Sequence, residues 1–268
     1  DASSGIAGYI ITTTDTTPTG FTLGSTAKGS KTVTSAGTYY VWIKDNAGNI
    51  GKASISAYTM KRSQGTGSTL TTRVDSTSES TGTEVTENTV VLGGTSVWAK
   101  ATANTGYNTP VLKSETTTLT ASGASITVNA NTTISSSATV NNYTVKYDYE
   151  TNGGTTATKT TATVAYGSSI DLTPTATKDG WTFIGWNTDS TATSKLNSLK
   201  MSTSDVTLYA IYSKTITGTF KYNADTTKDI SVSKTIYNKE TTATIKAPAT
   251  TAIVVPSGYT FRPVSYTH

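Results

Sequence analysis

Apolar residues recur at every second position in short runs, which are separated by clusters of glycine, asparagine, aspartate and proline. The clearest run is 37–44, followed by a turn sequence at 45–49 and a returning run at 50–58. Alternation of this kind predicts half-buried β-strands joined by a hairpin turn. One face of the first strand would then carry Tyr39, Val41 and Ile43, and the other Tyr40, Trp42 and Lys44.

The same pattern predicts many further short strands. In chain order they are 6–11, 20–23, 89–92, 97–101, 111–112, 125–128, 134–140, 143–149, 161–165, 170–172, 206–212, 216–222, 230–236, 242–245 and 258–261. A weakly patterned helical turn is expected around 194–201, and the polar stretch 76–87 is expected to be a hairpin loop. The expected fold is therefore mainly β.

The densest apolar cluster is Gly180-Trp181-Thr182-Phe183-Ile184-Gly185-Trp186. Weaker copies begin at Gly106, which lies 180 − 106 = 74 residues earlier, and at Gly258, which lies 258 − 180 = 78 residues later. A nearly fixed period predicts tandem modules. We place them at residues 1–57, 58–142, 143–214 and 215–268. The linkers between the later modules, 141–142 and 214–215, are short, so we expect an elongated, semi-rigid arrangement.

Composition agrees with thin sheets that keep one face in water. About a quarter of the residues are threonine, whose branched side chain suits a half-solvated strand. Hydrophobic residues make up 34% and charged residues 14%, and the net charge is only +4. The chain has no cysteine, so it has neither disulfides nor thiolate metal sites. Its lysines are scattered, which argues against nucleic-acid binding, and no apolar run reaches the ~20 residues of a membrane span.

The first module resembles the end of an immunoglobulin-like sandwich. The spacing Gly37-x-Tyr39-x-Val41 is similar to a tyrosine corner, with valine in place of the antibody cysteine. The string from Gly37 to Asn49 resembles the last hairpin of bacterial Ig-like surface repeats. Only four or five strands are visible where a sandwich needs about seven. We therefore expect a partial Ig-like unit, with the chain starting inside a domain of a longer polypeptide.

The third module resembles the Listeria–Bacteroides repeat, the B-repeat of internalin-type surface proteins. The matching residues are Tyr143-Thr144-Val145, Tyr166-Gly167, the cluster from Gly180 to Trp186, and Asp205-Val206-Thr207-Leu208-Tyr209-Ala210. The resemblance implies a β-grasp-like fold, a place on the cell surface or in the medium, and a spacer or adhesion role without catalysis. The second and fourth modules resemble the family less, since Val111-Leu112 and Arg262-Pro263 stand where the pattern differs.

Catalytic chemistry has little support in the sequence. The single histidine, His268, is the last residue, so no histidine-based triad or relay is expected. Asp148 and Glu150 form the remaining carboxylate pair, and exposed strand charges explain them better than a glycosidase does. We predict no catalytic residue, no metal ligand and no cofactor.

The sequence leaves three binding or crosslinking alternatives. The oxygen-rich set Asp1, Asp45, Asn46 and Asn49 has the chemistry of a calcium site, although a hairpin turn explains most of it. Lys246, followed by Ala247-Pro248, is faintly similar to a lysine in crosslinked collagen-binding modules. Stacking on sugar rings would use a tryptophan, and Trp42 is the predicted ligand-binding residue because we expect it to be exposed. The others are Trp98, Trp181 and Trp186, of which Trp181 is expected to be core.

The sequence therefore predicts a non-enzymatic stalk or adhesin segment of a large extracellular bacterial surface protein. Its expected partners are neighbouring repeats of the same polypeptide and glycans of the cell wall or a host surface, with a Gram-positive cell wall as the favoured location. A glycan- or host-surface-binding module is the first alternative. A self-assembling filament, built by strand addition between incomplete end modules, is the second.

Overall fold

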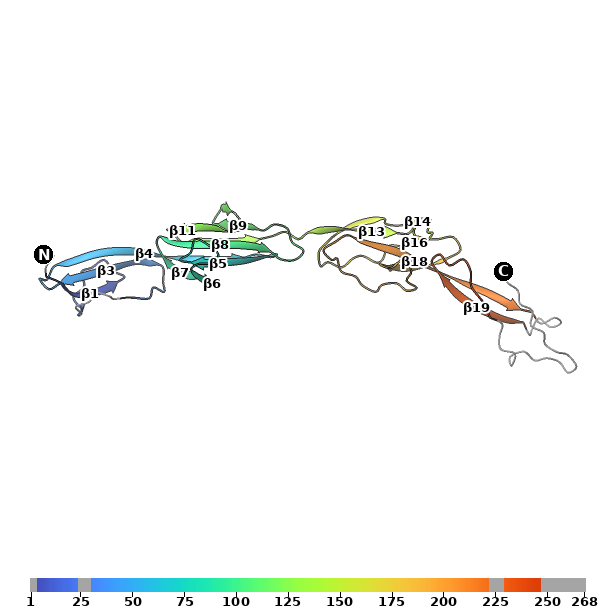
Figure 1. Cartoon of the computed structure of the whole chain (residues 1–268), viewed down its shortest axis with the longest axis horizontal. Helices are drawn as coiled ribbons and strands as arrows, with labels where there is room; N and C mark the ends of the chain where they lie inside the picture. The colour runs from blue at the N-terminus through green and yellow to red at the C-terminus, as the bar shows by residue number, and fades with distance from the viewer. Residues whose placement is uncertain (1–3, 24–29, 222–228, 247–268) are drawn as a thin grey trace, which may run out of the picture. The chain divides into compact units, whose positions relative to one another are not determined.

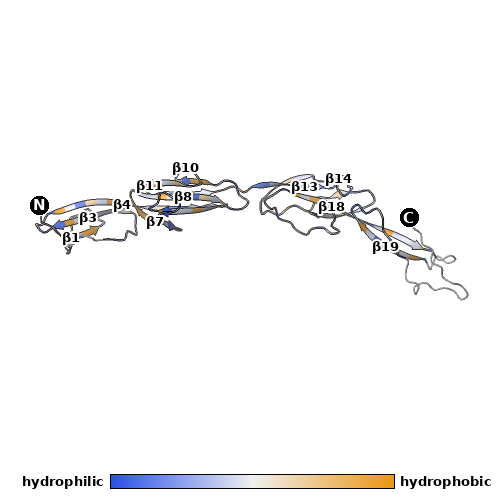
Figure 2. Cartoon of the chain, viewed as in Figure 1, coloured by the Kyte–Doolittle hydropathy of each residue, from blue (hydrophilic) through white to orange (hydrophobic). Residues whose placement is uncertain are grey.

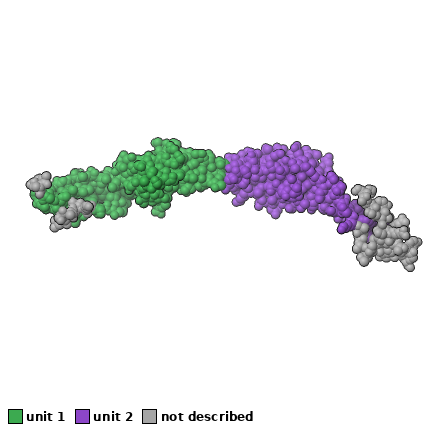
Figure 3. Space-filling model, viewed as in Figure 1, with its two compact units in different colours: residues 1–141 green, residues 142–268 purple. Residues whose placement is uncertain are grey.

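The computed structural model describes residues 4–23, 30–221 and 229–246, and within these ranges the chain contains β-strands and no helix (Figure 1). The chain divides into two compact units, Asp1–Asn141 and Asn142–His268 (Figure 3). Each unit has its own sheets and its own buried core. The prediction of a mainly β fold made of small modules is confirmed.

Unit 1 holds the first twelve strands. They are β1 (Ile6–Thr12), β2 (Thr22–Leu23), β3 (Gly37–Asp45), β4 (Ile50–Gln64), β5 (Ser68–Val74), β6 (Thr83–Val85), β7 (Thr89–Leu92), β8 (Thr95–Ala103), β9 (Val111–Ser114), β10 (Thr117–Leu119), β11 (Ala124–Val128) and β12 (Thr132–Ser137). One eight-stranded sheet runs in the order β10-β9-β12-β4-β3-β1-β2, with β7 also paired to β4. A second sheet has the order β11-β8-β5-β6.

The amino-terminal part of the large sheet is the antiparallel set β2-β1-β3-β4, and it contains the predicted hairpin. Residues 37–44 of β3 pair with residues 50–57 of β4, as the alternation predicted. The Tyr39 hydroxyl donates a hydrogen bond to the Ser35 carbonyl at 2.9 Å, four residues upstream. This is the hydrogen bond of a tyrosine corner. The partial Ig-like assignment itself stays a prediction.

Strand β4 joins this part of the sheet to the next without a loop. It is 15 residues long, well above the usual five or six. Its residues up to Ala57 pair with β3, and its residues from Ala57 onward pair with β7 and β12. The boundary predicted between residues 57 and 58 therefore falls inside a continuous strand.

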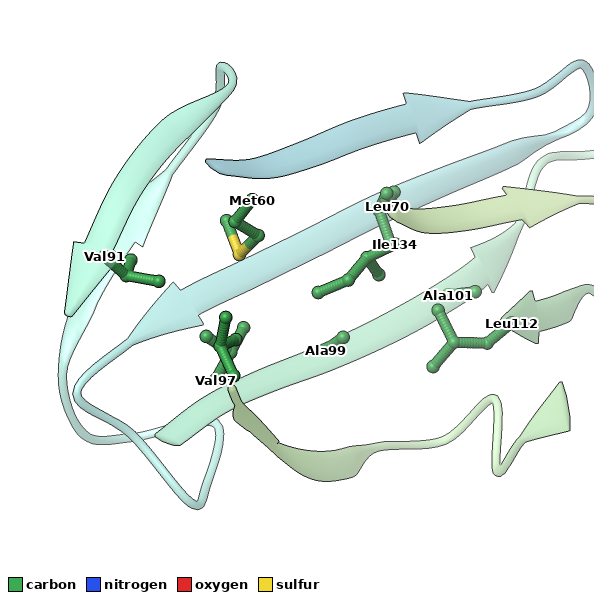
Figure 4. Close-up of a cluster of buried hydrophobic side chains, with 9 residues drawn as sticks. Met60, Leu70, Val91, Val97, Ala99, Ala101, Leu112 and Ile134 are labelled. Carbon is green, nitrogen blue, oxygen red and sulfur yellow. The ribbon is translucent and has the colours of Figure 1, made fainter. Parts of the chain in front are cut away.

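The core of unit 1 lies between the two sheets (Figure 4). The large sheet contributes Met60, Val91, Leu112 and Ile134, and the second sheet contributes Leu70, Val97, Ala99, Ala101 and Val128. Each strand supplies every second residue, so the apolar half of each alternating run faces inward. We call residues 57–141 the sandwich module.

Unit 2 holds the remaining strands. They are β13 (Asn142–Asp148), β14 (Thr156–Ala157), β15 (Thr161–Ala165), β16 (Ala176–Thr177), β17 (Thr182–Asn187), β18 (Val206–Phe220) and β19 (Ile230–Tyr237). The main sheet has the order β15-β13-β18-β17, β19 also pairs with β18, and β14 pairs with β16. We call residues 142–213 the repeat module, and residues 213–220 of β18 together with β19 the ribbon.

Trp186 is the centre of the repeat-module core and is 1% exposed. Its ring lies edge-on to Tyr147, with centroids 5.2 Å apart, and to Phe183 at 5.5 Å. Its indole N–H donates to the Pro174 carbonyl at 2.6 Å, so the one polar atom of the buried ring is satisfied. The aromatic cluster of the sequence is therefore a folding core.

The sandwich and repeat modules share one pairing pattern. In each, the first strand pairs antiparallel with the next strand of the sheet (β4 with β7, β13 with β15) and parallel with the last strand (β4 with β12, β13 with β18). Asn131 precedes β12 and accepts the amide N–H of Thr59 at 2.9 Å, and Asp205 precedes β18 and accepts that of Thr144 at 2.7 Å. A polar side chain thus closes the ladder at the same place in both modules.

The helical turn predicted at 194–201 is wrong, since these residues form bends and irregular structure, with an isolated bridge from Lys200 to Ser169. Their backbone groups bond to other segments. The Leu196 N–H donates to the Trp186 carbonyl at 2.8 Å, and the Leu199 carbonyl accepts the Ile170 N–H at 2.8 Å. An α-helix needs those groups for its own i to i−4 bonds.

Several strand boundaries also differ from the prediction. Residues 170–172 and 242–245 form no strand, residues 83–85 of the predicted loop form β6, and residues 214–215 of the predicted linker lie inside β18. Strand β5 was missed because only Leu70 and Val74 are strongly apolar in its sequence. The predicted strand at 258–261 lies outside the described residues.

We expect Trp186→Ala to lower the free energy of unfolding of unit 2 by about 3–5 kcal/mol, because it opens a cavity at a fully packed site. Hydrogen exchange at β13 and β18 amides measures this loss separately from unit 1. Trp181→Ala is the matched control, since Trp181 is only half buried and should cost less. An equal loss in both variants would contradict the assignment of Trp186 as the core.

Candidate functional site

Trp42 is buried, so the exposure on which its predicted ligand-binding role depended is not found. Its side chain is 5% exposed, and its indole N–H donates to the Thr12 hydroxyl at 3.0 Å. The Lys52 ammonium, on the paired strand, lies 5.4 Å from the ring centroid and forms an ion pair with Asp15 at 2.5 Å. The expected exposure was wrong because alternation assigns a residue to a face but does not say what covers that face.

The other tryptophans also lack an open ring face. Trp98 is 6% exposed, and a Cβ placed on Gly123 would lie 2.8 Å from its ring, so the turn at Gly123 packs directly against it. Trp181 is half buried against the repeat-module core, as expected. None of the four tryptophans is a ready platform for a sugar ring.

The carboxylate pair of the sequence does not form an acid–base site. Asp148 is paired with Lys146 at 3.0 Å and accepts the Thr151 N–H at 2.8 Å. Burial raises the pKa of Asp148, but the hydrogen bonds from Thr151 and Lys146 outweigh it and leave the pKa below its ordinary value. A general acid needs a raised pKa, so Asp148 acts as a structural cap.

The oxygen-rich set at the 45–49 turn is used by the turn itself. The Asp45 carboxylate accepts both the backbone N–H and the side-chain amide of Asn49 at 2.8 Å, and the Asn46 side chain donates to the Ser4 carbonyl at 2.6 Å. Asp1 lies outside the described residues. Within the described ranges, no group of three or more metal-ligating side chains is present.

Sequence reasoning missed a second polar cluster, at the start of the ribbon. Asn238 follows β19, is 7% exposed and has a φ of 54°. Its carboxamide oxygen accepts the Tyr212 N–H at 3.1 Å, and its amide donates to the carbonyls of Ser190 at 3.2 Å and Ala192 at 2.8 Å. These bonds attach the ribbon to the repeat module at the point where β19 ends and the ribbon part of β18 begins.

Lys178 completes this cluster. Its ammonium lies 3.8 Å from the Trp181 ring centroid and donates to the Asn238 carbonyl. Burial, with a smaller contribution from Lys239, lowers the pKa of Lys178, and burial raises the pKa of Tyr212 to about 12. We call Lys178, Trp181, Tyr212 and Asn238 the ribbon clamp. No sequence signal pointed to it, because its members are scattered over 60 residues.

A known protein family matches most of the repeat module. Residues 143–211 match the Listeria-Bacteroides repeat domain. This segment runs from β13 into β18 and includes the buried Trp186 core except for Tyr212, the next residue along β18. The repeat predicted for the third module is thereby confirmed. The family is found in bacterial surface proteins.

No curated protein matches the chain. Within the described ranges, the structure contains no helix long and apolar enough to cross a membrane. The similarity to the repeat family covers residues 143–211.

We expect Asp45 to titrate at about pH 2, against 3.8 for a free aspartate, because the hydrogen bonds from Asn49 favour its charged form. A lowered pKa in the folded state contributes stability at pH values above 3.8, and this contribution is lost as pH falls through about 2. Carboxyl NMR chemical shifts measure the titration. In Asn49→Ala the pKa should return toward 3.8, and an unchanged pKa would contradict the hydrogen-bond cause.

Proposed function

We propose that this chain is a non-catalytic spacer or adhesin segment of a large extracellular bacterial surface protein. It sets small β modules one after another and presents a distal region at a distance from the cell. The match of residues 143–211 to a family of bacterial surface proteins supports the location and the structural role. The observation that carries the mechanical part is the way in which successive parts of the main sheet are joined.

In each unit, one long strand continues from one part of the main sheet into the next part. Strand β4 belongs to the amino-terminal part of the eight-stranded sheet and to the sandwich module, and β18 belongs to the repeat module and to the ribbon. Bending such a junction breaks ladder hydrogen bonds, each with a net value of about 0.5–1.5 kcal/mol. A flexible linker offers no such resistance. A shared strand therefore suits a part that transmits force.

The ribbon clamp adds side-chain hydrogen bonds to the junction at β18, between the repeat module and the ribbon. Five hydrogen bonds connect Asn238 to the repeat module, two with Tyr212 and one each with Ser190, Ala192 and Lys178. Asn238 and Tyr212 are buried, so the bonds between them are shielded from competition by water, and the bonds to Ser190, Ala192 and Lys178 are partly buried. Bending at this position would break the hydrogen bonds of the buried Asn238 carboxamide, and a buried polar group without partners costs free energy.

We also propose that residues 57–141 are a divergent copy of the repeat. The two modules have the same pairing pattern and the same ladder-closing side chain, Asn131 in one and Asp205 in the other. Neither feature depends on the Gly-Trp signature that the sandwich module lacks. The ribbon would begin a further copy, in line with the predicted module at 215–268. Self-association and filament formation stay predictions.

Small-angle scattering of the full chain tests the spacer role. A compact globule of 268 residues has a radius of gyration of about 18 Å. Modules set in a row should give a clearly larger radius and a particle that stays monomeric on dilution. A value near that of the globule would contradict the proposal.

We expect Asn238→Gly to loosen the ribbon by about 1–3 kcal/mol, because it removes the buried carboxamide but tolerates the positive φ. Hydrogen exchange should become faster at β19 amides and stay unchanged at the β13 amides of the repeat-module core. Asn238→Ala should lose more, since alanine is strained at this φ. If β13 and β19 lost protection together, the ribbon would not be a separate element held by the clamp.

A further inference from the structure

We propose that a groove in unit 1 binds a saccharide, whose apolar ring face would lie on Ile55 and Leu92 and whose hydroxyls would bond to the Asp75 carboxylate. The groove has a volume of about 530 Å³ and is open to solvent. It lies where β4, the β7–β8 turn and the loop after β5 meet. Its lining residues are Ile55, Asp75, Ser76, Thr77, Thr81, Leu92, Gly93, Gly94, Thr95 and Ser96. The site does not depend on the spacer role.

Two aliphatic side chains line the groove and are exposed, and we call this pair its floor. Ile55 is 37% exposed and Leu92 is 39% exposed. Within the described residues only five large hydrophobic side chains are exposed to this degree, and two of them line this one groove. Isolated exposed apolar residues need no explanation, but a pair inside a concave surface is what an apolar ligand face requires.

The rim of the groove carries hydroxyls and one carboxylate. Thr77, Thr95 and Ser96 have side-chain hydroxyls that form no hydrogen bond with other described residues, and the Asp75 carboxylate has neither a hydrogen bond nor an ion pair there. Asp75 also has a φ of 53°, a conformation that non-glycine residues seldom adopt. A backbone conformation of this kind is common at ligand sites, where surrounding bonds hold it.

The rim is held in place before any ligand arrives. The Ser76 N–H donates to the Ser96 carbonyl at 3.0 Å, and the Arg73 guanidinium donates to the carbonyls of Thr81 at 2.7 Å and Gly82 at 3.1 Å. Next to the floor, the Gly93 N–H donates to the Ser56 carbonyl at 2.7 Å. A fixed site loses little conformational entropy on binding, so even a few contacts give measurable affinity.

These groups match a saccharide better than a peptide. A pyranose ring has one face of C–H groups for the aliphatic floor and a ring of hydroxyls for the polar rim. A carboxylate accepts two such hydroxyls, and the free threonine and serine hydroxyls both donate and accept. A basic peptide would find a single negative charge in the lining, that of Asp75. For one open groove we expect a dissociation constant on the order of 1 mM.

The test is an NMR titration of the full ¹⁵N-labelled chain with cellotriose, chitotriose and mannotriose. At least one of the three should shift the amide signals of residues 75–77 and 92–96. Asp75→Asn should weaken binding about ten-fold, since asparagine tolerates the positive φ but removes the charged acceptor. Leu92→Thr should weaken it several-fold and keep the strand, since threonine suits an exposed strand position.

Matched controls make the result specific. Asp179→Asn removes an exposed carboxylate in unit 2, and Val111→Thr removes an exposed aliphatic side chain, 44% exposed, outside the groove. Neither should change the dissociation constant. Equal affinity for Asp75→Asn and the unchanged chain would overturn the proposal. Three other results would also overturn it. These are amide shifts that cluster at another surface, no shift at residues 75–77 and 92–96 with any of the three sugars, and shifts there with the basic peptide trilysine but not with the sugars.

Discussion

The parallel pairing of the first and last strand is the constraint on which the sandwich module and the repeat module depend. Two parallel strands cannot be joined by a tight turn, so the chain between them must cross over and return. In the repeat module that crossover carries Pro174, Trp186 and Met201 into or beside the core. In the sandwich module it carries the whole second sheet. Closing the parallel pair therefore encloses the core in both modules.

This constraint explains how a chain so poor in apolar residues folds. Many strands bury mainly one face, although β18 buries the consecutive residues Ala210, Ile211 and Tyr212. Threonine occupies many of the exposed positions. The resulting cores are small but fully enclosed, with Met60, Leu112, Ile134, Leu208 and Ile211 among the residues with no measurable exposure. Hydrogen bonds between strands then provide much of the remaining stability, so β4 and β18 can continue past one core into the next part of the same sheet.

The continuous strand β4 is common to the spacer role and to the saccharide groove. Strand β4 places Ile55 near Leu92, because Leu92 of β7 pairs with Ala57, two residues further along β4. Both residues line the groove. The mechanical role and the binding site thus have one structural cause, although each can be tested alone.

The sequence by itself determined the strands, the turns and the principal core. Alternation located β3, β7, β13 and β19, the glycines at 94, 106 and 153 have the positive φ that turns require, and the aromatic cluster around Trp186 is buried. These are local properties of the chain. Only the tertiary structure decided that Trp42 is covered, that β4 and β18 continue past the expected boundaries, and that Ile55, Asp75 and Leu92 meet. Those outcomes depend on residues far apart in sequence, and alternation carries no information about what packs against a face.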